Sequence, residues 1–375
     1  MASDVNFNDF WARDSFWASF GMLESGLDLD QVKKSLELFL LYQREDGKIP
    51  RKIVLDYNGL KYLGIKIKRK KPRPIYTSSI KWHFSVDDNL LLVIAFCKYI
   101  ERTNDLEFAK KYYEQVKRAL EFYSKKGLIR ENLIHEVGFS NWEDTIYKKG
   151  FVLYTSCLWY EAVGQFKKIY SILSFAETQD FASLQEINIP LTKDILSQIQ
   201  KLFWLKDEGY FADSVYKSNQ QKYFDLAGNM LAILFDIATT EQAEKILRFV
   251  ETNCNASLQD ERNILHPINY PLYPWYRISP VLFLFNIQKY QNGISWSWVE
   301  VLLVAAEVKM GKIEQAKIHL ENLSNVIIKN GHIHETYWLD GRPFNHLFWK
   351  SAVPFAWGAG LYLYALAKLE KSDLA

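Results

Sequence analysis

The chain has 375 residues, of which 49% are hydrophobic and 24% are charged, and its formal net charge at pH 7 is +2. This amount of apolar surface argues against disorder, and the balanced charge provides no global attraction to nucleic acid or to an anionic membrane. No linker rich in Pro, Gly or Ser divides the sequence. We therefore expect a single domain over residues 1–375.

The cysteines and the apolar stretches indicate the compartment. Cys97, Cys157 and Cys254 are odd in number and far apart, which disfavours a disulfide framework and fits a reducing environment. The opening MASDVNFNDF lacks the basic and apolar regions of a signal peptide. The longest uncharged stretch, 351–367, is shorter than the ~20 apolar residues of a bilayer span. We expect a cytoplasmic protein without a membrane partner.

Apolar residues recur with the 3.6-residue period of a helix in about eleven segments, and no strand-rich block competes with them. In chain order these segments are 8–25, 30–44, 86–102, 105–125, 153–173, 191–204, 224–237, 240–252, 295–310, 312–329 and 350–369. The predicted fold class is therefore all-α.

The connections between these helices differ in length in a regular way. Short turns at residues 25–30, 102–105, 237–240 and 310–312 are typical of antiparallel helical hairpins. Long connections alternate with them, apart from a loop of medium length at 174–190. Successive hairpins close into a toroid and bring alternate connections to one rim. We predict an (α/α)6 toroid, with one helix short or missed at the N-terminus and the functional site on that rim.

The long connection before 153–173 contains a candidate general acid. Asn141 is followed by Trp142, Glu143 and Asp144. A carboxyl group beside Trp can be shielded from water, which raises its pKa and keeps it protonated at neutral pH. The alternative is a loop turn with exposed acids.

The last long connection contains a candidate general base. Glu335 lies close in sequence to Tyr337 and Trp338, and a turn at Gly341 follows. A carboxylate in an aromatic cleft that holds water has the chemistry of a general base. The alternative is an ion pair between Glu335 and Arg342.

The opening FWARDSFW contains adjacent Arg13 and Asp14. Such a pair can hold neighbouring sugar hydroxyls, which both donate and accept hydrogen bonds, although it can also cap a helix. Tryptophans at loop–helix joints suit stacking on pyranose faces, although each taken singly is more often a core residue. Further candidates on the rim are Trp82, Asp87, Asp88, Asp225, Trp296 and Trp298.

Other classes of site lack their sequence patterns. The seven histidines show no metal-binding spacing, and we find neither a Gly-rich phosphate loop nor a strained Ser elbow. We therefore predict no metal and no cofactor, and we disfavour nucleotide and Ser-hydrolase chemistry. The basic run from Lys66 to Arg73 is expected to be a solvated surface loop, and no function is assigned to it.

These motifs together resemble the six-hairpin (α/α)6 glycosidases, especially the glucoamylase-like group that contains the amylo-1,6-glucosidase part of glycogen-debranching enzymes. The resemblance covers almost the whole chain as ordered motifs. FWARDSFW looks like the family's Arg-Asp segment, VDDNLLLVIAF its Val-Asp stretch and NWED its Trp-x-Asp acid segment. GISWSW, HETYWLDGRP and SAVPFAWGAG resemble its closing block, whereas YFDLAGNM replaces the family's Arg-Pro-Asn-Gln.

The resemblance implies that Asp144 is the proton donor and Glu335 the general base, and that Arg13, Asp14 and Asp87 bind the terminal sugar. We predict an inverting, exo-acting glycoside hydrolase that releases a terminal sugar from an oligosaccharide, with an α-glucoside as substrate. Its two carboxyl groups should lie roughly 6.5–9.5 Å apart. Trp142 and Trp338 are expected to stack on the sugar, and Trp82 and Trp296 to contact it.

Two alternatives stay open. One is a non-catalytic carbohydrate-binding or regulatory toroid. The other is a sugar epimerase or isomerase, which needs a pair of histidines in the cleft, and His332 and His334 form the close pair in the sequence. The sequence also leaves open the sugar, the anomer, the linkage and the oligomeric state.

Overall fold

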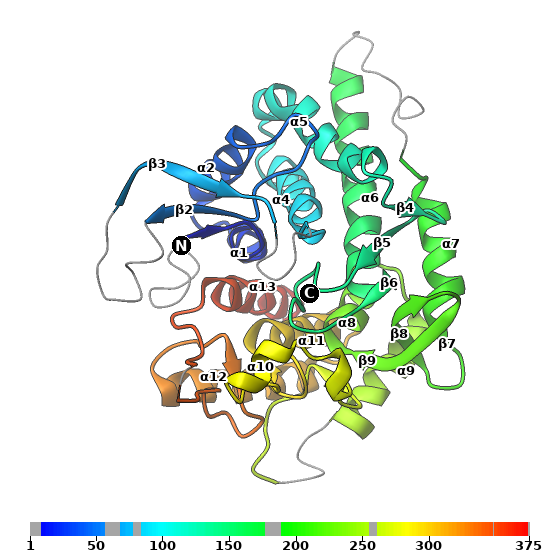
Figure 1. Cartoon of the computed structure of the whole chain (residues 1–375), viewed down its shortest axis with the longest axis vertical. Coiled ribbons are helices and arrows are strands. Elements are labelled where there is room, and N and C mark those ends of the chain that lie inside the picture. The colour runs from blue at the N-terminus through cyan, green and yellow to red at the C-terminus, as the bar shows by residue number, and fades with distance from the viewer. Residues whose placement is uncertain are drawn as a thin grey trace.

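The computed structural model describes residues 9–56, 68–77, 84–176, 189–254, 261–347 and 349–373. Helices dominate these ranges (Figure 1). The first group is α1 (Ala12–Ser25), α2 (Leu29–Leu41), α4 (Asp87–Thr103), α5 (Leu106–Lys125), α6 (Leu153–Ala176) and α7 (Thr192–Phe203). The second group is α8 (Leu226–Leu234), α9 (Thr240–Phe249), the short α10 (Pro280–Leu284), α11 (Ser297–Lys309), α12 (Ile313–Asn330) and α13 (Ala356–Asp373).

Six of the helices form a closed ring. Each of α1, α4, α6, α8, α11 and α13 packs against the next in this order, and α13 packs against α1. Figure 1 shows this closure, with the red α13 close to the blue α1. Outside the ring, α2, α5, α7 and α12 each pack against the inner helix that precedes them, and α9 packs against a strand of the sheet. The predicted ring of helical hairpins is confirmed for the described residues.

The sequence itself separates inner from outer helices. In α11 every residue from Ser297 to Glu307 is buried, because an inner helix is surrounded on all sides. The outer helix α5 instead buries one stripe that includes Phe108, Val116 and Tyr123, and it exposes its charged face to water. Burial of a single stripe against the ring is enough to hold such an amphipathic helix.

The contact that closes the ring depends on glycine. A Cβ atom added to Gly21 of α1 would lie 1.6 Å from the carbonyl oxygen of Gly360 in α13. A Cβ atom added to Gly360 would lie 2.4 Å from the Cα atom of Ala18. The two helices therefore approach at a distance that any larger side chain would prevent.

The prediction of a purely helical fold is wrong, because the long connections contain strands. An antiparallel sheet has the order β10-β9-β8-β6-β5-β4, with β7 paired to β8, and smaller sheets are β1-β2-β3 and β11-β12. The early strands are β1 (Phe10–Trp11), β2 (Lys52–Asp56), β3 (Lys68–Ile75), β4 (Ile129–Arg130), β5 (Leu133–Val137) and β6 (Lys149–Val152). The later strands are β7 (Trp204–Leu205), β8 (Tyr210–Tyr216), β9 (Asn219–Asp225), β10 (Asn269–Tyr270), β11 (Ser295–Trp296) and β12 (Thr336–Tyr337).

The basic run predicted as a surface loop is also different. Its described part, from Lys68 onward, belongs to β3, which pairs antiparallel with β2. Backbone hydrogen bonds hold this strand, and lysines on an edge strand are a common device against aggregation. The run is thus a charged sheet edge, while residues 66 and 67 lie outside the described ranges.

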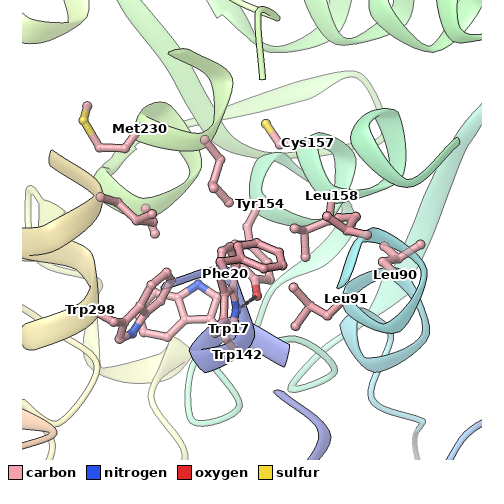
Figure 2. Packing of buried hydrophobic residues seen from close by; sticks show 14 of the residues in the cluster. Trp17, Phe20, Leu90, Leu91, Trp142, Tyr154, Cys157, Leu158, Met230 and Trp298 are labelled. Carbon is pink, nitrogen blue, oxygen red and sulfur yellow. Dashed lines mark hydrogen bonds between the residues drawn. The ribbon is translucent and has the colours of Figure 1, made fainter. Parts of the chain in front are cut away.

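Aromatic and aliphatic side chains pack together in the core of the ring (Figure 2). Trp17 of α1 donates a hydrogen bond from Nε1 to the hydroxyl of Tyr154 in α6, at 3.3 Å. Trp142 meets Trp298 of α11 edge to face, with ring centroids 4.8 Å apart. This cluster joins three inner helices beneath the loop that contains Asp144. Within the described residues, we find no helix with the length and apolar character needed to cross a membrane.

Candidate active site

The long connections all lead into the inner helices, so the first turns of those helices lie on one rim of the ring. A cavity of about 240 Å³ opens there. Its charged lining consists of Arg13, Asp14, Arg51, Asp144 and Glu335. Its aromatic lining consists of Trp11, Trp142, Tyr290, Trp296, Trp349, Phe355 and Trp357. The two acids expected to be catalytic therefore line the same cavity, although they come from connections far apart in the chain.

Glu335 lies in the wall of this cavity and is only 4% exposed. Its Oε1 atom accepts a hydrogen bond of 2.9 Å from the Tyr290 hydroxyl, and its Oε2 atom has no partner among the described residues. Burial raises the pKa of Glu335 to about 8, with a smaller contribution from the negative charges of Asp14 and Asp144, and the Tyr290 hydrogen bond opposes this rise.

Backbone hydrogen bonds fix the position of Glu335 on both sides. Its N–H donates to the carbonyl of Ala352 at 2.9 Å, and its own carbonyl accepts from the N–H of Ser297 at 3.1 Å. The adjacent Thr336 pairs with Trp296 across β11 and β12. The carboxyl group is thus held by a small sheet at the start of α11.

Asp144 has a different environment. Its side chain is 23% exposed, and Oδ2 accepts a hydrogen bond of 2.8 Å from the Arg51 guanidinium. Gln291 holds the loop on either side of Asp144, because its amide donates to the Trp142 carbonyl at 2.6 Å and its oxygen accepts from the Thr145 N–H at 2.9 Å.

Tyr290 and Gln291 together connect the two acids. Tyr290 contacts Glu335 through its hydroxyl, and the next residue holds the loop that contains Asp144. A short segment therefore sets the relative position of both carboxyl groups.

The arginine at the start of α1 pairs with a carboxylate of another inner helix. Arg13 forms a bidentate ion pair with Asp87 of α4, with Nε–Oδ2 at 2.8 Å and Nη2–Oδ1 at 2.9 Å. Asp87 is fully buried, also accepts from Ser85, and does not line the cavity. The guanidinium of Arg13 is thus held by Asp87 and not by the adjacent Asp14, and the bidentate geometry fixes its orientation.

Asp14, in contrast to Asp87, is part of the cavity lining. It lies in the first turn of α1 and lines the cavity beside Arg13. Burial raises the pKa of Asp14 to about 6, while the positive charges of Arg13 and Arg51 oppose the rise. Asp14 is therefore available to a ligand, whereas Asp87 positions Arg13 from behind the cavity wall.

Only some of the tryptophans proposed as sugar-binding residues line the cavity. Trp142 and Trp296 line the cavity, with ring centroids 5.4 Å apart and nearly perpendicular planes. Trp298 lies in the core, and Trp338 packs on Phe344 at 4.8 Å outside the cavity. Trp82 lies outside the described residues.

Several lining residues were missed by sequence reasoning. Arg51, Tyr290 and Gln291 occur in long connections without any motif that distinguishes them. Their roles come from contacts across the ring, which leave no local signal. Conversely, the histidines His332 and His334, on which an epimerase would depend, do not line the cavity.

A ring of hairpins whose rim places carboxylates among tryptophans has the architecture of the six-hairpin glycosidases. The chain belongs to the glycoside hydrolase family described as "Alkaline and neutral invertase", whose sequence profile matches residues 165–366. It is thus a glycoside hydrolase by family. No curated protein matches the chain at a significant level.

Solved structures with a similar fold have low sequence identity. A rhamnosidase from Klebsiella oxytoca with rhamnose bound has a TM-score of 0.63 at 13% identity, covering 96% of this chain and 58% of the other. A GH63 mannosylglycerate hydrolase from Thermus thermophilus in complex with glucose has a TM-score of 0.66 at 13% identity, covering 97% of this chain and 94% of that one. An uncharacterized conserved protein from the same organism gives a TM-score of 0.67 at 12% identity, with the same coverage. At this identity the likeness establishes the fold alone.

Proposed function

We propose that the protein is an inverting, exo-acting glycoside hydrolase that releases the terminal sugar of an α-glucoside. Residues 1–375 would act as one catalytic-type domain, in the cytoplasm, and the three buried free cysteines agree with a reducing compartment. The observation that carries the proposal is that Asp144 and Glu335 line the same small cavity in different environments.

In the proposed reaction, Asp144 donates a proton to the glycosidic oxygen as the bond to the sugar breaks. Glu335 accepts a proton from a water molecule that attacks the opposite face of the sugar, through a transition state with oxocarbenium character. Arg51 donates to the Oδ2 atom of Asp144 in the free protein, so the proton that passes to the leaving oxygen would be held on Oδ1. The unpaired Oε2 atom of Glu335 is the acceptor that remains for the water.

The size of the cavity supports exo action. Its volume of about 240 Å³ is below the roughly 300–1,000 Å³ that is usual for ligand pockets. It therefore suits a terminal sugar better than the middle of a long chain. Asp14 and Arg13 are placed to bind hydroxyls of that sugar, and Trp142 and Trp296 are placed to contact its apolar faces.

The experiment is incubation with sucrose, maltose, isomaltose and α-linked manno-oligosaccharides, followed by detection of released monosaccharide. We expect hydrolysis of at least one α-glucoside, with losses of about 10²–10⁴-fold in Asp144→Asn and Glu335→Gln, because each variant removes one proton-transfer group. Glu314→Gln, at a side chain that is 85% exposed on α12, is the matched control and should retain activity.

Hydrolysis that survives either substitution would contradict the assignment of that residue. Sugar binding measured by calorimetry, without hydrolysis of any member of the panel, would instead support the non-catalytic carbohydrate-binding toroid.

A further inference from the structure

A second group of carboxylates includes Glu143, the residue directly before Asp144. Glu143, Asp213 and Asp225 each direct a carboxylate oxygen into the same space, with these oxygens within 4.8 Å of one another. All three residues are at most 1% exposed. They come from the acid loop, from β8 and from the end of β9. Their separation in the sequence explains why no metal-binding spacing is visible there.

Lys148 balances only part of this charge. Its ammonium group contacts Glu143 Oε2 and Asp213 Oδ1 and is itself buried. Three carboxylates against one ammonium leave a deficit of two positive charges when all are ionised. An uncompensated charge in a site of this depth is strongly unfavourable.

Most of the oxygens that Lys148 does not reach have no partner. Asp213 Oδ2 accepts a hydrogen bond of 3.0 Å from the Ser214 hydroxyl. Both oxygens of Asp225, the Oε1 atom of Glu143 and the Tyr273 hydroxyl are buried, and none of them makes a hydrogen bond of normal geometry among the described residues. Asp225 stands at the N-terminal end of α8 without forming a capping hydrogen bond. Buried polar atoms without partners usually indicate a missing water molecule or ion.

The geometry points to a structural calcium site formed by Glu143, Asp213 and Asp225, with Tyr273 beside it. The donors are all hard oxygen atoms, which Ca²⁺ prefers, and a divalent ion supplies the two missing charges. Oxygens on opposite sides of a Ca²⁺ ion, at about 2.3–2.6 Å from it, are up to ~5 Å apart, which accommodates the observed separation, whereas Mg²⁺ needs shorter contacts and retains more water.

The local structure supports a built site. The register of β8 and β9 shifts between Ala212 and Ser214, and this irregularity re-aims Asp213 toward the cluster. Lys148 and Ser214, the neighbours of the cluster, also line a surface pocket of about 420 Å³. The role of the ion would be to hold Glu143, and with it the neighbouring Asp144, against the sheet. This inference does not depend on the proposed hydrolysis.

The test uses the full chain after treatment with a chelator and dialysis. We expect calorimetry to detect one Ca²⁺ per chain and the melting temperature to rise as Ca²⁺ is added, whereas Mg²⁺ at the same concentration has little effect. Asp225→Asn should weaken Ca²⁺ binding by more than about 100-fold, since loss of a direct ligand costs at least as much as loss of an outer partner. Asp207→Asn, at an exposed acid of the turn before β8, should bind as the wild type does.

Absence of Ca²⁺ binding, equal binding of Mg²⁺, or binding unchanged in Asp225→Asn would overturn the inference. If Asp225→Asn does not fold, Tb³⁺ luminescence of the wild-type protein decides. A buried site predicts Tb³⁺ that is displaced by Ca²⁺ and retains few bound waters, from lifetimes in H₂O and D₂O. A fully hydrated Tb³⁺ ion would contradict the site.

Discussion

The proposed role of Glu335 requires an ionised carboxylate at a position where burial disfavours the charge. As a general base it must be ionised, but burial favours its protonated form and raises its pKa to about 8. The Tyr290 hydroxyl, which donates to Oε1, partly compensates for the lost water. The residue thus has the perturbed environment that is typical of catalytic groups.

The first prediction concerns the pH dependence of activity. Because Glu335 must be ionised while Asp144 still holds a proton, kcat/KM should depend on pH as a bell, with one limb near 8, the pKa of Glu335 in the free protein. Tyr290→Phe removes a hydrogen bond that lowers this pKa, so this limb should move to higher pH. Initial rates measured from pH 5 to pH 10 test both statements. Absence of a limb near pH 8, or a limb there that does not move in Tyr290→Phe, would contradict them.

The second prediction concerns stability. The folded protein holds a proton on Glu335 between the ordinary pKa of 4.5 and about 8, whereas the unfolded chain releases it. Folding therefore loses stability as pH rises through this window, by at most ~1.4 kcal/mol per pH unit. Glu335→Gln removes this cost, so its melting temperature should exceed that of the wild type by a margin that grows from pH 5 to pH 8. A margin that is constant or shrinks with pH would exclude the linkage.

At the scale of elements, the sequence predicts the helices well and the strands poorly. Each predicted helical segment corresponds to an observed helix, because the apolar period of an inner or outer helix is local. The bounds of the last helix differ by several residues, because the sequence predicts 350–369 and the helix spans Ala356–Asp373. The strands are short and pair across distant connections, as β10 does with β9, so they leave little periodic signal.

In the candidate site, too, the sequence predicts features with a local signal and misses those that depend on contacts between distant segments. Asp144 and Glu335 were selected from local motifs and resemblance, and both line the cavity. Arg51 and Gln291 act through side-chain contacts between separate connections, which a single sequence does not reveal. Asp87 was recognised as important, but its partner, Arg13, became apparent only from the packing of α1 on α4.

The third prediction tests the contact that closes the ring. Gly360→Ala places a methyl group against the backbone of Ala18, and overpacking of this kind costs about 1–3 kcal/mol or more of unfolding free energy. Gly164→Ala in α6 is the control, because its nearest neighbour is a Thr192 methyl group at 3.5 Å. There the higher helix propensity of alanine should leave stability unchanged or raised by about 0.5–1 kcal/mol. Urea unfolding of both variants provides the comparison, and equal effects would contradict the proposed role of the α1–α13 contact.

At the scale of the whole molecule, the ring brings residues from distant parts of the chain to one site. Because the inner helices start on the same rim, residues before α6, in the first turn of α1 and before α13 meet at one cavity. Figure 1 shows how the first and last inner helices lie together in this arrangement. The family establishes a glycoside hydrolase, and the sharing of one cavity by Asp144 and Glu335 leads to the proposed inverting mechanism.

The most direct test of that mechanism is the anomer of the first sugar released, followed by ¹H NMR during the initial minutes of hydrolysis, before mutarotation. If Glu335 activates water opposite the bond that Asp144 protonates, an α-glucoside should yield β-glucose first. The appearance of α-glucose as the first product would contradict the account, because it requires a covalent intermediate or attack from the same face.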